Sequence, residues 1–176
     1  MKALLFDTET TGLVKNVAIP DAKQPFVIEF CGCVLNENTG EAEWHEMLIK
    51  PPVPISAEIT EITGITQDMV VGAEPFAVHV DRLLALFSGV DRVVAHNLSF
   101  DRDIMDIEMR RHGATIEWPE LVCTMEATAH WTGRWLNLGK LHAQLFGEPH
   151  ENAHRARPDV EALVRVYQEL RKRGEV

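Results

Sequence analysis

Four acidic residues and one histidine, spread over three segments of the chain, are the side chains best suited to chemistry. They are Asp7, Glu9, Asp101, His154 and Asp159. Carboxylates at the end of a buried strand are unfavourable unless a positive charge compensates them, and converging carboxylates are the ligands that divalent cations prefer. If the fold brings the three segments together, the sequence predicts metal-assisted phosphodiester chemistry.

The first segment is an acidic pair that directly follows the apolar run 3–6. Because Asp7 and Glu9 are two residues apart, an extended strand points both side chains to the same side, where they can share a cation. Taken alone, such a pair is as often a strand end that faces solvent. Gly12 can adopt a positive φ and bring backbone amides close to a ligand.

The second segment joins an apolar strand to a helix. Asp101 lies in the first turn of this helix, beyond the end of the strand at 93–95. In open α/β sheets ligands collect at such strand ends, although an acid in this position can also simply complement the helix dipole. Asp103 and Asp106 compete as ligands, but only Asp101 lies where strand and helix meet.

The third segment precedes and begins the last helix. Asp159 follows Pro158, a residue that suits the first helical turn. An offset of five would place His154 and Asp159 far apart around a continuous helix, so His154 fits best on the preceding loop. A single histidine before a helix is usually structural or exposed.

The elements that must position these segments follow from the hydrophobic pattern. Strands are predicted at 2–7, 26–35, 42–50, 93–95 and 121–123. Helices are predicted at 56–62, 73–87, 98–112, 124–131, 137–146 and from Pro158 onward. The turn at 36–40 makes the first three strands an antiparallel meander. Strands followed by helices with late crossovers predict an α/β fold, in which helices flank a mixed sheet.

Size and composition predict one globular domain over residues 1–176. The apolar stretch at the N-terminus stops at Asp7, too short for a secretory signal, and no run is long enough to span a membrane. We therefore expect a cytoplasmic protein with no membrane partner. Cys31, Cys33 and Cys123 are expected to be reduced and buried, the first two on one strand face.

The formal net charge of −10 argues against broad, non-specific binding of duplexes, which requires many cationic contacts to phosphates. A nuclease that grips only a chain end remains compatible with this charge. Five basic residues near the motifs could supply local positive potential, or could simply be solvated surface charges. They are Arg102, Arg134, Lys140, Arg155 and Arg157.

Together the segments resemble the DEDDh family of 3′–5′ exonucleases, the group that contains the proofreading epsilon subunit of bacterial DNA polymerase III. The matching runs are Phe-Asp-Thr-Glu-Thr-Thr-Gly-Leu at 6–13, Ile-Thr-Gly-Ile-Thr at 62–66, Val-Ala-His-Asn-Leu-Ser-Phe-Asp at 94–101 and His-Arg-Ala-Arg-Pro-Asp at 154–159. The resemblance covers almost the whole chain in the expected order. It implies a ribonuclease H-like fold.

The resemblance also implies a mechanism. Asp7, Glu9, Asp101 and Asp159 would hold two divalent ions, Mg²⁺ or Mn²⁺, and His154 would be the general base. Two such ions can lower the pKa of a water molecule and stabilise the attacking and leaving oxygens, while histidine can accept a proton near neutral pH. Hydrolysis at single-stranded nucleic acid 3′ ends would release nucleoside 5′-monophosphates.

Substrate contacts come from the same resemblance. Thr10, with Gly12 beside it, would meet the terminal nucleotide, and Leu13 would wedge against the terminal bases. The pocket would be lined by His96, Asn97 and Phe100. Apolar wedges and stacking accept any base, so binding would be specific for the end and not for the sequence.

Two departures and one loop qualify the resemblance. Thr63 stands where the family often has histidine. The related tyrosine branch would need tyrosine four residues before Asp159, where this chain has Arg155, so the histidine branch is favoured. The loop at 14–25 follows the first motif and could border the substrate.

The leading hypothesis is an autonomous exonuclease that acts on DNA, in proofreading or repair. One alternative is an enzyme that trims RNA or short oligoribonucleotides, because recognition of the 2′-hydroxyl is not readable here. Another is a module that binds nucleic acid ends without catalysis, although it would not need the complete acidic set. A phosphatase with an aspartyl nucleophile would require aspartate in place of Glu9. Neither a polymerase or repair partner nor the oligomeric state can be read from the sequence.

Overall fold

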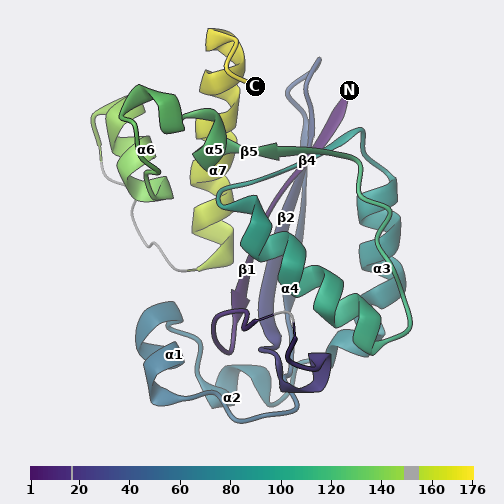
Figure 1. Ribbon diagram of the computed structural model, residues 1–176. Coiled ribbons are helices and arrows are strands. Elements are labelled where there is room, and N and C mark those ends of the chain that lie inside the picture. Colours follow the sequence, from purple (N-terminus) through teal and green to yellow (C-terminus); the bar gives the residue numbers. More distant parts are fainter. Residues whose placement is uncertain (17, 149–154) are drawn as a thin grey trace.

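A single mixed sheet forms the centre of the computed structural model, which describes residues 1–16, 18–148 and 155–176 (Figure 1). Its strands are β1 (Lys2–Thr10), β2 (Val27–Asn36), β3 (Ala42–Leu48), β4 (Arg92–Ala95) and β5 (Glu120–Cys123). The order across the sheet is β3-β2-β1-β4-β5. The first three strands are antiparallel, whereas β4 and β5 run parallel to β1. The predicted α/β architecture is confirmed.

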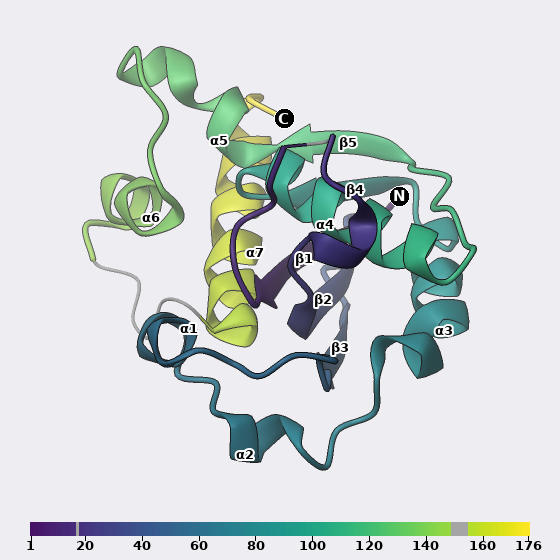
Figure 2. The same ribbon diagram turned by 60° about the horizontal axis from the view of Figure 1, so that its bottom comes forward.

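Helices cover both faces of this sheet (Figures 1 and 2). The long helices are α3 (Phe76–Ser88), α4 (Leu98–Arg111) and α7 (Ala156–Arg173); the shorter ones are α1 (Ala57–Thr63), α2 (Gln67–Val70), α5 (Thr124–Ala127) and α6 (Leu138–Phe146). Single 3₁₀ turns occupy Asp21–Lys23 and Ala129–Trp131. Within the described ranges, no helix has the length and apolar character needed to cross a membrane.

Side-chain alternation along β1 divides the core into two layers. Leu4 and Phe6 pack with α3 and α4 on one face. Leu5 packs with α7 on the other face, together with Cys31 and Cys33. Both cysteines are buried and free, as predicted, whereas Cys123 is free but only partly buried, contrary to the prediction. The face that carries Leu5 also carries the next two odd-numbered side chains of β1, Asp7 and Glu9, because strand side chains alternate with a period of two.

The first strand is longer than predicted. The sequence suggested that it stops at Asp7, but β1 continues to Thr10 because β2 pairs with it along its whole length. The register becomes irregular only between Glu9 and Thr10. The acidic pair therefore lies within a paired strand and not beyond its end.

The opposite edge of β1 is only partly paired. β4 is short, and it pairs with β1 over Ala3, Leu4 and Leu5. Beyond Leu5 the backbone of β1 faces the start of α4, the helix that follows β4 directly. This short fourth strand leaves room for a side chain of α4 to reach the backbone of β1.

Two other predictions differ in detail. The helix predicted at 124–131 divides into α5 and a 3₁₀ turn, since Thr128 stands between them and donates its hydroxyl to the Thr124 carbonyl at 2.9 Å. α2 was not predicted; Thr66 caps this short helix by accepting the Met69 N–H. The helix predicted at 56–62 is confirmed, with the Ser56 side chain accepting from Ile59 N–H at its start.

Candidate active site

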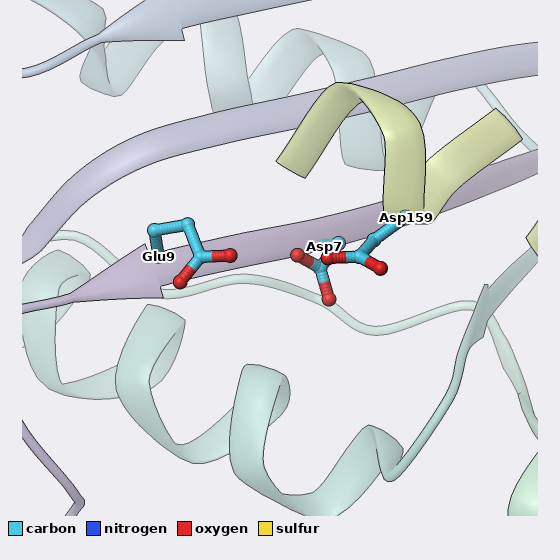
Figure 3. Close-up of side chains that lie close together, drawn as sticks. All are labelled: Asp7, Glu9 and Asp159. Atoms are coloured by element: carbon cyan, nitrogen blue, oxygen red, sulfur yellow. The ribbon is translucent and has the colours of Figure 1, made fainter. Parts of the chain in front are cut away.

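Three of the predicted carboxylates meet at one point of the fold. Asp7 and Glu9 project from β1, and Asp159 comes down from the first turn of α7 (Figure 3). Each offers an oxygen, and these oxygens all lie within 4.8 Å of one another. Residues about 150 positions apart in the chain thus form a single acidic cluster, because α7 packs on the face of β1 that carries both acids.

Asp101 approaches the cluster from α4. Its side chain is 3% exposed and accepts two hydrogen bonds from Thr8, one from the backbone N–H at 3.1 Å and one from the hydroxyl at 2.7 Å. The backbone N–H is available because β4 does not pair with this part of β1. Asp101 lines the same cavity as the three clustered acids but is not part of their 4.8 Å group.

The four carboxylates share a cavity of about 370 Å³. The other described residues in its wall are Thr8, His96, Asn97, Phe100, Asn137, Leu138 and Gly139. A larger cavity of about 530 Å³ lies elsewhere, between the start of β2, the residues after β3 and the ends of α3 and α4. We place the candidate active site in the smaller cavity, since it contains the acidic cluster.

Burial and mutual repulsion raise the pKa of three of these acids, Asp7, Glu9 and Asp101. Desolvation, followed by the charges of Asp101 and Asp159, raises the pKa of Asp7 well above its usual range. Burial is also the main reason why the pKa of Glu9 rises to about 8 and that of Asp101 to about 7. Hydrogen bonds from Thr8 oppose the rise at Asp101, and the positive charge of Arg155 opposes it at Glu9. These carboxylates need positive charge in order to be ionised together.

The donor set fits hard divalent cations. All of the clustered ligand atoms are carboxylate oxygens, the type that Mg²⁺ and Mn²⁺ prefer over the nitrogen and sulfur donors typical of zinc. A bound cation would also lower the raised pKa values, since it would favour the ionised forms that burial disfavours. Asp7, Glu9 and Asp159 are therefore the residues that would hold a cation, with Asp101 beside them.

His96 and Asn97 line the cavity but have structural roles as well. The His96 ring lies between Thr124 Oγ1 and the Leu136 carbonyl, each 2.9 Å from one ring nitrogen. Because a carbonyl can only accept, Nε2 carries the proton, and burial lowers the pKa of the ring. Asn97 adopts a left-handed conformation, with φ 63° and ψ 47°, where the chain turns from β4 into α4.

The predicted substrate residues at the end of β1 lie outside the cavity wall. Within the described part of the chain, Thr10, Gly12 and Leu13 are not among its lining residues. Thr10 is buried and donates its hydroxyl to the Gly12 carbonyl at 2.6 Å, and Gly12 has a positive φ of 159°. Leu13 is 80% exposed, which excludes a core role and leaves it available for an external contact.

The competing acids of α4 belong to other contacts. Asp103 pairs with Arg102 at 3.0 Å, and Asp106 accepts the Trp118 indole N–H at 2.9 Å. The start of the loop at 14–25 lies next to the candidate active site, because Val14 and Lys15 share a shallow hollow with Asn97 and Phe100. This hollow adjoins the cavity, since Asn97 and Phe100 line both.

The sequence also singled out His154 and Thr63. His154 lies outside the described residues. Thr63 is buried, and its hydroxyl donates to the Ile59 carbonyl at 2.9 Å and accepts the Ile65 N–H at 3.1 Å. Thr63 therefore stabilises the turn after α1.

Sequence reasoning missed the wall formed by the start of α6. Asn137, Leu138 and Gly139 line the cavity. Asn137 also caps α6 by accepting the Lys140 N–H at 2.9 Å. The cap is readable as a local pattern, but no sequence signal links it to the acidic segments. The link is long-range, through the hydrogen bond between His96 and the carbonyl of Leu136, the residue that precedes Asn137.

Comparisons with known proteins identify the family of the chain. The family model described as exonuclease, RNase T type, matches residues 4–167. The DNA polymerase III PolC-type protein of Listeria monocytogenes is 34% identical over 162 residues, which are 90% of this chain and 10% of that protein. The corresponding protein of Mycoplasma pneumoniae is 27% identical over 176 residues, 98% of this chain and 12% of that one. The chain thus spans about a tenth of the length of these curated relatives.

Solved structures show the same fold. The nuclease domain of 3′hExo, described as a DEDDh family member bound to rAMP, superposes with a TM-score of 0.77 at 16% identity, covering 98% of this chain and 92% of that one. Exonuclease I gives a TM-score of 0.78 at 20% identity, with coverage of 97% and 41%. The family resemblance noted in the sequence is confirmed: the chain belongs to the exonuclease family.

Proposed function

We propose that this domain is a metal-dependent 3′–5′ exonuclease that removes nucleoside 5′-monophosphates from single-stranded DNA ends. The observation that carries the proposal is the cluster of Asp7, Glu9 and Asp159, whose oxygens lie within 4.8 Å of one another beside buried Asp101. Such a concentration of carboxylates in one cavity suits phosphodiester hydrolysis assisted by cations.

Two divalent cations, Mg²⁺ or Mn²⁺, are the proposed cofactors. When bound, they would supply a water molecule of lowered pKa and stabilise negative charge on the attacking and leaving oxygens. They would also offset the repulsion between the acids and the phosphate of the substrate. Asp7, Glu9, Asp101 and Asp159 hold the cations in this proposal.

Side chains of the chain itself orient the reaction. His154, five residues before Asp159 in the sequence, is the proposed general base that takes the proton of the attacking water. The cavity wall made by Phe100 and the Asn137–Gly139 segment borders the terminal nucleotide. Leu13, which is exposed, is proposed to contact the terminal bases, and Thr10 at the end of β1 is proposed to contact the 3′-hydroxyl.

Preference for DNA is supported by the likeness to PolC-type DNA polymerases, at 34% identity over 90% of the chain. A polymerase as partner, with a proofreading role, is proposed on the same ground. The structure offers a compact cavity at the end of the sheet, which suits a single-stranded end better than a duplex. The negative net charge of −10 also disfavours extended contact with a duplex.

A time course with end-labelled oligonucleotides tests this function. DNA and RNA of one sequence, single-stranded and double-stranded, are incubated with Mn²⁺, with Mg²⁺ and with a chelator. We expect stepwise loss of 3′ nucleotides from single-stranded DNA that stops when metal is removed. Faster removal from RNA would change the substrate class, and no release from either polymer with either metal would refute the proposed activity.

A further inference from the structure

Two arginines tie the first turn of α7 to the sheet, each through an ion pair with a different strand. Arg155 pairs with Glu29 of β2, and Arg157 pairs with Glu46 of β3. We propose that Glu29 and Arg155 form a positioning pair, which holds Asp159 at the distance from β1 that cation binding requires. This inference rests on the proposed function and assigns roles to two residues outside the carboxylate set.

The contacts of Glu29 fix both the side chain and the backbone at the start of the helix. Its two oxygens accept from Arg155 Nη2 at 2.7 Å and from Arg155 Nε at 3.1 Å. The oxygen facing Nε also accepts the Ala156 backbone N–H at 3.0 Å. A strand carboxylate thus caps α7 and complements its dipole, although Arg155, the N-cap residue, makes no side-chain cap of its own.

The same contacts lead directly to Asp159. The Arg155 carbonyl accepts the Asp159 N–H at 3.1 Å, the first-turn hydrogen bond of α7. Any shift of Arg155 relative to Glu29 therefore moves the backbone of Asp159. The strand pairing fixes the positions of Asp7 and Glu9. The ion pair between Glu29 and Arg155 therefore sets the position of Asp159 relative to them.

Sheet register distinguishes the two arginine pairs. Glu29 lies directly opposite Glu9, so the pair touches the edge of the acidic cluster. Glu46 lies opposite Cys31, which in turn lies opposite Asp7, so a whole strand separates Glu46 from β1. Arg157 also stacks over Trp44 of β3, 3.6 Å from the ring centroid. Both pairs hold the start of α7, but only the one with Glu29 borders the ligands.

A competing explanation is purely electrostatic. The charge of Glu29 raises the pKa of Glu9, and the charge of Arg155 lowers it. If charge alone mattered, removing the negative group would weaken cation binding, and removing the positive group would strengthen it. Positioning predicts instead that both substitutions weaken binding, because either one releases the start of α7. The sign of the Arg155 effect therefore separates the two explanations.

The test is calorimetric titration of the full chain with Mn²⁺ alone, without nucleic acid. We expect Glu29→Gln and Arg155→Met each to weaken Mn²⁺ binding about 10-fold, the lower end of the range for residues that orient metal ligands. The double variant should be no weaker than either single one, since the same contact is lost. Arg155→Lys keeps the charge but loses the two parallel hydrogen bonds to Glu29, so it should weaken Mn²⁺ binding several-fold. This variant serves as the test if the other variants fold poorly.

Arg157→Met is the matched control. It breaks an ion pair at the same helix start and should lower the melting temperature as much as Arg155→Met does, while leaving Mn²⁺ affinity within about 2-fold of the original. Tighter binding by Arg155→Met, unchanged affinity in Arg155→Lys, or an equal loss in Arg157→Met would each overturn the positioning role. Unaltered protein that binds Mn²⁺ but does not shorten oligonucleotides would refute the proposed function alone, whereas failure to bind Mn²⁺ would refute both.

Discussion

Each end of α4 buries a carboxylate, but the charged groups next to the two carboxylates differ. Asp101 in the first turn is 3% exposed, and Glu108 near the last turn is 2% exposed. Both accept a backbone N–H from a strand, from Thr8 at 3.1 Å and from Val27 at 2.9 Å respectively. Glu108 also has a cation of its own, Arg111 Nη1 at 3.1 Å. For Asp101, burial and then the charge of Asp159, another carboxylate, raise the pKa.

This difference distinguishes an acid that is paired within the chain from an acid that lines the candidate active site. Arg111 not only balances Glu108 but also donates to the carbonyls of Asp21 and Gln24 and stacks on Phe26, so the pair holds the loop before β2. Glu108 thus has its counter-charge within the chain itself. At the other end the fold gathers Asp7, Glu9, Asp101 and Asp159 around one cavity, where burial and mutual repulsion raise the pKa of Asp7, Glu9 and Asp101.

The largest expected effect is on activity. Asp101→Asn keeps the shape and the ability to accept from Thr8, but it removes a negative charge from the cation site. We expect kcat on single-stranded DNA to fall about 10³-fold, equivalent to about 4 kcal/mol of lost transition-state stabilisation. Glu108→Gln, the matched change at the other end of α4, should leave kcat within a few-fold. Equal losses in both variants would remove the functional distinction between the two acids.

The next largest effect is on stability, where Glu108→Gln should cause the greater loss and Asp101→Asn the smaller. Glu108→Gln leaves the Arg111 guanidinium buried without its counter-charge, which should lower the free energy of unfolding by about 3 kcal/mol. In metal-free solution Asp101→Asn should instead be neutral or stabilising, because it relieves repulsion among buried acids. Urea denaturation in the presence of a chelator measures both. A larger loss in Asp101→Asn than in Glu108→Gln would contradict the comparison.

Cation binding should stabilise only one end of the helix. A ligand at 100 times its dissociation constant adds about 2.7 kcal/mol to the stability of the state that binds it. With Mn²⁺ in that excess, thermal melting of the original protein and of Glu108→Gln should shift upward alike. Asp101→Asn should show a much smaller shift. An equal shift in all three proteins would place the cation away from Asp101.

Local patterns in the sequence were enough to find the acids of this site. The two-residue spacing of Asp7 and Glu9 indicates a shared strand face, and the positions of Asp101 and Asp159 just inside helix starts follow from apolar periodicity. The structure confirms these placements. The geometric outcome differs for Asp101, which lies beside the 4.8 Å group and not within it.

Contacts between distant segments could not be predicted. The pairing of Arg155 with Glu29 joins residues 126 positions apart, and Thr8 meets Asp101 across 93 positions. Both depend on strand register and on the short length of β4, which local periodicity does not encode. The extension of β1 to Thr10 was missed for the same reason, because it is the partner strand that sustains it.

The smallest expected effect is the pH dependence of the metal-free protein. Burial raises the pKa of Glu9 from 4.5 to about 8 and that of Asp101 from 3.8 to about 7. Between the unfolded and the folded pKa of each group, the carboxyl group has lost its proton in the unfolded chain but retains it in the folded chain. Raising the pH therefore favours unfolding, and the stability present below about pH 4 is lost progressively up to pH 8.

Melting curves in a chelator at pH 5.5 and pH 8 measure this loss. We expect a decrease of about 2 kcal/mol at the higher pH, or roughly 4–8 °C in melting temperature. Asp101→Asn should remove more of the decrease than Glu108→Gln does. The pKa of Glu108 is also raised by burial, but the Val27 N–H and the charge of Arg111 oppose that rise. A melting temperature that increases towards pH 8 would contradict this expectation. It would show that Glu9 and Asp101 are already compensated within the chain, as Glu108 is by Arg111.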